Sequence, residues 1–199
     1  MVYTDIQKIK PESFQDYLDI DRHSFHSLLY VDRPFSGVTN KMKIGKLVDA
    51  ILTKQPPPIG YYSDEDYSAA KSIAREISDK FGDSIIKNVE CQPAFIGTIN
   101  DGVFKLPVKG IVDWYLEKKC VIDLKVTFNK VKDKNQALSF IRYMKYDYQI
   151  FNYKNLGECG MAYIMLHSVP NKNTFFFSVS DFQDAESWWL EQVLKYGII

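Results

Sequence analysis

The segment from residue 88 to residue 128 constrains the fold of this chain most, because its pattern is that of β-strands. Three runs rich in valine, isoleucine and aromatic residues are separated by Asn-Asp-Gly at 100–102 and by Glu-Lys-Lys at 117–119. Asn-Asp-Gly suits a tight hairpin turn. The pattern therefore predicts three strands that pair as a meander.

Helical periodicity lies on both sides of this segment. Apolar residues recur at helical spacing from residue 12 to about residue 55, which predicts at least two helices. Another helix is expected between Ser63 and Gly82, because Ser63 and Asp66 form an approximate capping box and glycine commonly follows a helix. After the strands we expect, in order, a polar loop at 129–136, a long helix to about residue 156, strands at 160–169 and 173–180, and a final helix from Asp181.

The length of 199 residues suits one domain and is short for two. A hydrophobic content of 46% is that of a globular protein rather than a disordered one. The order of elements predicts an α/β fold in which helices flank a mixed central β-sheet of about five strands. We expect a single domain over 1–199, with N-terminal helices in about 12–81 and the sheet and catalytic core in about 88–199.

Total charge excludes little, since 25 basic and 25 acidic side chains balance and favour neither nucleic acid nor membrane as a partner. The three cysteines are odd in number, far apart and without a CxxC spacing, which favours free thiols in a reducing compartment. No window resembles a signal peptide or a membrane span. We expect a cytoplasmic protein with no membrane partner.

Two carboxylates and a lysine interrupt the apolar strands. Because side chains alternate between the faces of a strand, Asp123 and Lys125 share one face, and Asp113 can join them if the second and third strands pair. Two carboxylates and the backbone carbonyl of Leu124 are hard oxygen ligands that suit Mg²⁺ or Mn²⁺. A lysine beside them can orient or deprotonate a water. The spacing alone leaves metal chemistry and a structural ion pair as equal alternatives.

Asp113, a short hairpin and then Asp123-Leu124-Lys125 resemble the D-x(n)-(D/E)-x-K motif of the PD-(D/E)XK nuclease superfamily. The helix–strand order agrees with the restriction-endonuclease-like core of that superfamily. The resemblance implies that Asp113, Asp123 and the Leu124 carbonyl hold Mg²⁺, that Mn²⁺ can substitute for it, and that Lys125 helps to generate the attacking water.

Gln149 and Tyr153 stand four residues apart in the helix after the motif and therefore share one helix face. They resemble the Q-x-x-x-Y motif of the RecE, RecB and lambda-exonuclease-like branch, where these residues lie beside the active site. Without the first motif, a core tyrosine with a polar neighbour would be the ordinary explanation. The two motifs together imply that Gln149 and Tyr153 belong to the catalytic group.

Two further metal ligands are suggested by the resemblance. Glu90 matches a glutamate that opens a strand before the motif aspartate in RecE-type proteins, although an exposed strand end is an equally good explanation. Asp49 stands four residues after Gly45, where relatives often carry a histidine. Aspartate can also bind the ion, so Asp49 is a candidate for the ligand that the helix contributes.

Basic residues cluster from Lys125 through Lys145, with six lysines and arginines against one aspartate. Such an excess can bind phosphates, although solvated surface lysines give the same pattern. Arg142 lies seven residues before Gln149 and is expected near the same helix face. The candidates for DNA binding are Arg142, Lys130, Lys132 and Lys145.

The resemblance implies a metal-dependent deoxyribonuclease that acts as an exonuclease on DNA ends, in recombination, repair or phage DNA metabolism. A nuclease-fold DNA-binding or accessory module without turnover is one alternative, and a sequence-specific endonuclease is another. Relatives in this branch often form rings around DNA. A homo-oligomer and a recombination or single-strand-annealing partner protein are therefore both consistent with the resemblance.

Overall fold

The strand is interrupted at residues 112–113, and the β-structure on either side of this interruption belongs to two different sheets. The computed structural model describes residues 2–12, 14–24, 28, 39–57, 62–81, 89–182 and 184–197. The first sheet has the order β1 (Val2–Ile9), β4 (Ala94–Asn100), β5 (Lys105–Ile111), β2 (His23–Ser24). The second has the order β3 (Glu90–Cys91), β6 (Trp114–Leu116), β7 (Cys120–Thr127), β8 (Met161–Ser168), β9 (Asn173–Ser178).

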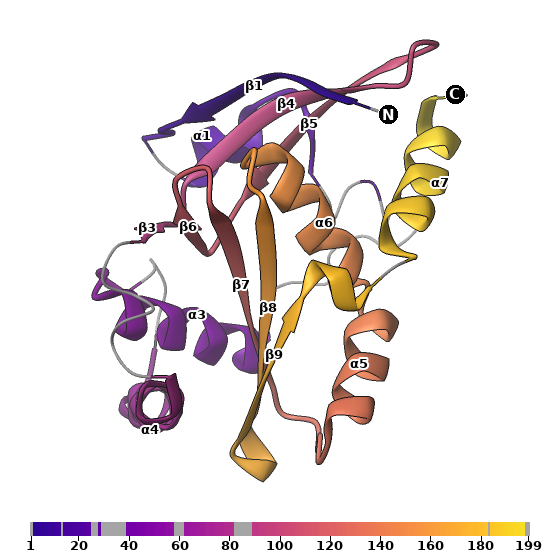
Figure 1. Ribbon diagram of the computed structural model, residues 1–199. Coiled ribbons are helices and arrows are strands. Elements are labelled where there is room, and N and C mark those ends of the chain that lie inside the picture. The colour runs from indigo at the N-terminus through magenta and orange to yellow at the C-terminus, as the bar shows by residue number, and fades with distance from the viewer. Residues whose placement is uncertain are drawn as a thin grey trace.

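Helices cover both faces of the second sheet, as Figure 1 shows. On one side lie α3 (Asn40–Thr53) and α4 (Asp64–Phe81), and on the other lie α5 (Lys134–Tyr143), α6 (Tyr146–Leu156) and α7 (Ala185–Gly197). The short helix α1 (Phe14–Asp19) lies by the first sheet. Short 3₁₀ turns follow β8 and β9 at Val169–Asn171 and Val179–Asp181. This mixed α/β arrangement is a restriction-endonuclease-like fold.

The alternation of side chains along β7 sorts them between the two helical layers. Ile122 and Leu124 pack with residues of α3 and α4, whereas Val121 packs with residues of α6. β7 runs parallel to β8, and Asp123 is opposite Ile164 in that pair. Because β7 and β8 are buried on both faces, a polar side chain on β7 is enclosed between sheet and helix.

Several predicted elements are confirmed. Helix α4 begins with the expected capping box, since Ser63 Oγ accepts from the Asp66 N–H at 3.2 Å and Asp66 Oδ2 accepts from the Ser63 N–H at 3.0 Å. Asn-Asp-Gly turns the β4–β5 hairpin, and Gly102 has φ 93°, a conformation that favours glycine. The loop at 55–57 agrees with the proline run.

Other predictions were wrong in detail. The expected first and second strands are each two strands, because the chain passes from one sheet to the other at residues 92–93, between β3 and β4, and at residues 112–113, between β5 and β6. The expected long helix is two helices, because Lys145 adopts a left-handed conformation with φ 59° between α5 and α6. The last helix begins at Ala185 rather than Asp181, and β1 was not predicted. Of the predicted helix around residues 25–29, only Leu28 lies among the described residues.

Within the ranges that the structure describes, no helix is both long and apolar enough to span a bilayer.

Candidate active site

Strand β7 turns Asp123 and Lys125 toward α6, as the alternation of side chains predicts. Asp123 is 1% exposed, and its Oδ1 and Oδ2 lie 2.9 and 2.7 Å from Lys125 Nζ. The ammonium is directed at Oδ1, while Oδ2 is in ion-pair range but has no hydrogen-bond partner among the described atoms. Burial alone would lower the pKa of Lys125, but the charges of Asp123 and Asp113 outweigh it and raise that pKa. The lysine is therefore a cation held among acids.

Asp113 lies at the crossing between the two sheets rather than within a strand, which corrects the predicted alternation at this position. Its Oδ2 accepts a hydrogen bond from the Leu124 N–H at 2.8 Å, and its carbonyl accepts one from the Gln92 N–H at 2.9 Å. Burial raises the pKa of Asp113 well above the ordinary value, and the nearby charges of Asp123 and Asp49 raise it further. The crossing thus brings Asp113 to the middle of the motif on β7.

Helix α3 contributes a third carboxylate, Asp49, which is 6% exposed. The Gln92 side-chain amide donates to Oδ2 of Asp49 at 2.6 Å, and the indole of Trp114 donates to Oδ1 at 2.9 Å. Burial raises the pKa of Asp49, the two hydrogen bonds and Lys125 lower it, and the charge of Asp123 raises it. Asp49 is therefore electrostatically part of the group formed by Asp113, Asp123 and Lys125.

Gln92 and Trp114 were not predicted from the sequence as members of this site. Gln92 stands directly before Pro93, which indicates a break in the strand, but nothing in the local pattern indicates that its amide reaches Asp49. Trp114 has the pattern of a core residue and is 1% exposed. Their contacts join residues 43 and 65 positions apart in the chain, so they depend on the tertiary fold.

Helix α6 places Gln149 and Tyr153 on the face that packs toward β5 and β7. Gln149 Nε2 donates to the Tyr153 hydroxyl at 2.8 Å, and both side chains are buried. Burial raises the pKa of Tyr153 well above its ordinary value, and so do the charges of Asp123 and Asp113. Gln149 Oε1 is buried without a hydrogen-bond partner among the described residues. The two residues of the second motif therefore lie beside those of the first.

Glycine at position 110 permits this close approach of α6. A Cβ at Gly110 would lie 3.0 Å from Cε1 of Tyr153 and 3.1 Å from Cδ1 of Leu156. Real Cβ atoms rarely come so close to a ring carbon, so a larger residue would displace the helix or the tyrosine ring.

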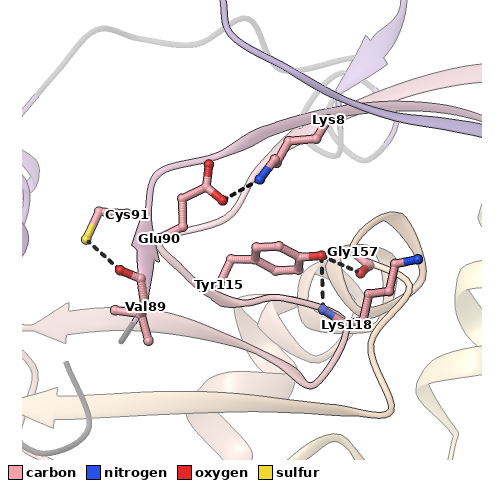
Figure 2. Close-up of polar contacts among 7 residues, drawn as sticks. All are labelled: Lys8, Val89, Glu90, Cys91, Tyr115, Lys118 and Gly157. Atoms are coloured by element: carbon pink, nitrogen blue, oxygen red, sulfur yellow. Dashed lines mark hydrogen bonds and ion pairs between the residues drawn. The ribbon is translucent and has the colours of Figure 1, made fainter. Parts of the chain in front are cut away.

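Glu90 does not join the acidic group. Its Oε2 lies 2.6 Å from Nζ of Lys8 on β1, and both side chains are more than a third exposed. Figure 2 shows Glu90 directed toward Lys8, with the ring of Tyr115 beside the pair. The pairing of Glu90 with Tyr115 in the β3–β6 ladder places both on one face. The structure thus favours the exposed strand end over the metal ligand for Glu90.

The candidate phosphate contacts are dispersed. Lys130 and Lys132 are exposed in the loop between β7 and α5, where Val131 between them is buried. Arg142 is exposed near the end of α5, and the break at Lys145 means that Arg142 and Gln149 do not share a continuous helix face. Lys145 turns toward Tyr148 and Trp188 instead.

The donor set fits a divalent cation, although no three Asp, Glu, His or Cys side chains among the described residues are close enough to form a metal cage. The charge of Asp123 raises the pKa of both Asp113 and Asp49, and Asp123 Oδ2 has no hydrogen-bond donor among the described residues. Carboxylate oxygens are the ligands that Mg²⁺ and Mn²⁺ prefer. The carbonyl of Leu124 stays a predicted ligand, since the contact seen at Leu124 is made by its N–H.

A family of PDDEXK-like domains of unknown function (DUF3799) matches residues 29–174. A crystal structure described as "Putative exonuclease" from Eubacterium rectale superposes with a TM-score of 0.57 at 19% identity, covering 82% of this chain. This chain covers 66% of that protein, which is just under two thirds. Comparison with curated protein sequences finds no match.

Two other solved structures overlap more loosely. SSO0001 is 17% identical and superposes with a TM-score of 0.37. The match covers 81% of this chain and 83% of the SSO0001 chain. Rai1 from Scheffersomyces stipitis is 12% identical and superposes with a TM-score of 0.36. That match covers 81% of this chain and 45% of the Rai1 chain. The family match spans most of the chain, including both motifs. The chain therefore belongs to this PDDEXK-like family and, with it, to the PD-(D/E)XK nuclease superfamily.

Proposed function

We propose that this chain is a metal-dependent deoxyribonuclease that hydrolyses phosphodiester bonds at DNA ends. One observation carries the proposal: Asp113 is hydrogen-bonded to the Leu124 N–H, directly between Asp123 and Lys125. Residues of both sequence motifs, from different elements, thus lie around one partly buried cationic side chain. A purely structural ion pair would need neither the third carboxylate of Asp49 nor the pair on α6.

Asp113 and Asp123 would hold Mg²⁺, with Asp49 as the third carboxylate and Mn²⁺ as a substitute. When bound, the ion would neutralise the substrate phosphate and lower the pKa of a water. Gln92 and Trp114 keep both oxygens of Asp49 oriented through hydrogen bonds of 2.6 and 2.9 Å. Such partners of a ligand usually tune metal affinity.

Lys125 and the pair on α6 would position the reacting groups. The Lys125 side chain is 18% exposed, so we expect it to reach a substrate phosphate or the attacking water from within the group. Gln149 and Tyr153 fix one another by their hydrogen bond and close the α6 side of the group. Gln149 Oε1 has spare hydrogen-bonding capacity there for a donor on substrate or water.

The test is cleavage of end-labelled linear DNA with Mg²⁺ by the Asp123→Ala and Lys125→Ala variants. We expect both to lose activity while retaining the circular dichroism spectrum of the parent. Asp79→Ala is a matched control, since Asp79 also pairs with a basic residue but is 72% exposed on α4. Full activity in either site variant would refute the assignment. EDTA should stop cleavage, and added Mn²⁺ should restore it.

The preference for ends is tested with linear and covalently closed circular DNA of one sequence. We expect the linear form to be degraded and the closed circle to survive. Digestion of both at equal rates would identify an endonuclease instead.

A DNA-binding module without turnover is the second candidate. It is favoured by the contact of Lys125 with both oxygens of Asp123, which occupies the carboxylate that a metal would need. Calorimetric titration with Mg²⁺, beside the cleavage assay, separates the two functions. DNA binding without Mg²⁺ binding or product would favour the module.

A further inference from the structure

Two large aromatic side chains project into solvent from α5 and α7. Tyr143, the last residue of α5, is 82% exposed, and Trp188, early in α7, is 49% exposed. Their neighbours Ile141 and Trp189 are completely buried, so each helix uses its other face for the core. A single exposed apolar residue is common on protein surfaces and carries little weight. The residues around these two rings are the reason to consider them a binding surface.

Lys145 lies two residues after Tyr143 and contacts the ring of Trp188 on α7. It is the left-handed residue between α5 and α6, and its Nζ lies 5.6 Å from the centroid of the Trp188 ring. The same ammonium lies 5.0 Å from the Tyr148 ring and donates to the Tyr148 hydroxyl at 3.4 Å. A cation over an aromatic face is attracted to it. The indole of Trp188 thus lies against the junction from which Tyr143 projects.

The junction continues into the acidic group. Tyr146 follows Lys145 directly, and Nζ of Lys125 lies 4.9 Å from the centroid of the Tyr146 ring. Lys125, inside the site, therefore contacts the ring of Tyr146, and Lys145, outside it, contacts the ring of Tyr148 two residues further along α6. Along this path lie Lys125, Tyr146, Lys145 and Trp188, with Tyr143 just upstream.

Charge at the junction is mixed. Arg142 and Lys145 supply the positive charge, while Asp147, Asp184 and Glu191 are close enough to affect the titration of a tyrosine there. Phosphate attraction alone would therefore be weak at this surface. Exposed aromatic rings can instead bind bases by stacking, and Arg142 and Lys145 can then contact the phosphates of the same strand.

We propose that Tyr143 and Trp188 form a stacking surface for unpaired nucleotides of single-stranded DNA beside the active site. The proposal rests on the proposed function for the presence of DNA there and adds the form of DNA that is bound. An unpaired base has a free face that an aromatic ring can cover, whereas the bases within a duplex are stacked on one another. The surface should therefore prefer single strands and tolerate any base.

The three tryptophans allow a direct binding test. Trp114 and Trp189 are 1% and 0% exposed, so a bound oligonucleotide can stack only on Trp188 among them. We expect oligo(dT) added in EDTA, where no cleavage is needed, to quench the tryptophan fluorescence of the full chain. A Trp188→Phe variant should lose the quenching, and a blunt duplex of equal length should quench at least tenfold less efficiently.

Tyr143 is tested with Trp188 as the reporter. Tyr143→Ala should weaken oligo(dT) binding about 5- to 150-fold, the range expected for loss of one stacked base. Tyr143→Phe keeps the ring and should bind like the parent. Lys71→Ala, at an exposed lysine on α4 on the other side of the sheet, should also leave binding unchanged. Because Tyr143 is almost fully exposed, these variants should fold like the parent.

The outcomes separate this inference from the proposed function. Cleavage of DNA without quenching of Trp188, or equal binding by Tyr143→Ala and Tyr143→Phe, would overturn the stacking surface and leave the nuclease intact. Quenching by oligo(dT) that responds to Tyr143→Ala supports the surface even if no variant cleaves DNA. Equal affinity for duplex and single strand would overturn the preference for unpaired bases.

Discussion

Trp114 donates its indole N–H to Oδ1 of Asp49 at 2.9 Å, so the residue directly after Asp113 holds the carboxylate that α3 contributes. Because neighbouring residues move together, the positions of Asp113 and Asp49 are coupled through the backbone of β6. Gln92, whose N–H binds the Asp113 carbonyl and whose side chain binds Asp49, adds a second connection between the same two acids.

Replacing Gln92 should weaken the site without weakening the fold. The Gln92 amide orients Asp49, and loss of such a partner typically lowers metal affinity about 10- to 100-fold. We expect Gln92→Ala to lower Mg²⁺ affinity in calorimetric titration. Gln15→Ala removes a similar glutamine–aspartate hydrogen bond, on α1, and should leave Mg²⁺ affinity unchanged. Equal Mg²⁺ affinity in the parent and Gln92→Ala would mean that Gln92 has no part in holding the ligand.

The ion pair on β7 should show strong coupling in a double-mutant cycle. Lys125→Met leaves Asp123 buried without its cation, which should lower the free energy of unfolding by about 3 kcal/mol. Adding Asp123→Asn removes the uncompensated charge and should recover most of that loss. Urea unfolding of the parent, both single variants and the double variant gives the coupling energy. Additive effects would argue against a direct interaction.

Glycine substitutions should separate close packing from helix propensity. Gly110→Ala places a Cβ 3.0 Å from the Tyr153 ring, so it should displace the tyrosine and lower both stability and activity. Gly45→Ala, on α3, meets only Val126 Cβ at 3.9 Å and should stabilise the protein by about 0.5–1 kcal/mol. Thermal unfolding with a cleavage assay measures both variants. A neutral Gly110→Ala would show that α6 can move without loss.

Asp147 should make stability depend on pH. Burial raises the pKa of Asp147 to about 6, above its value of about 3.9 in an unfolded chain. The folded state then binds more protons than the unfolded state between these pKa values, so stability falls as pH rises from about 4 to 6. Asp147→Asn keeps an oxygen that can accept from the Tyr148 N–H. It should stabilise the protein by about 2–3 kcal/mol at pH 7.5 and have little effect near pH 4. Urea unfolding at both pH values tests the sign.

Local signals predicted the elements that contain them. Helix α4 has its capping residues in sequence, and the β4–β5 turn has its glycine. β1 lacks such a signal, because Asp5 has φ 53° and the register with β4 shifts between Thr4 and Gln7, which breaks the alternation. The left-handed residue between α5 and α6 is a lysine, and neither glycine nor proline stands there to indicate the break.

The site residues likewise fall into those that a local sequence pattern predicts and those that it does not. Asp123 and Lys125 follow from strand alternation, and Gln149 and Tyr153 follow from helical spacing, because each pair lies within one element. The hydrogen bonds of Gln92 and Trp114 to Asp49 join separate elements, and no local pattern contains them. Glu90 had two explanations in the sequence, and its ion pair with Lys8 on β1, a strand that was not predicted, favours the exposed one.

The crossing between the two sheets also separates the β4–β5 hairpin, whose tip can change in length, from the acidic residues, whose positions are fixed. Both strands of the β4–β5 hairpin leave the second sheet together, where the Gln92 N–H binds the Asp113 carbonyl and the Val112 N–H binds the Pro93 carbonyl at 3.2 Å. These two bonds set the register of Asp113 before the hairpin begins. Residues 94–111 can therefore accept insertions at the exposed Val103 tip, or grafted loops, without shifting the acids relative to Lys125. The tip of this hairpin is therefore a place where new binding specificity can be built.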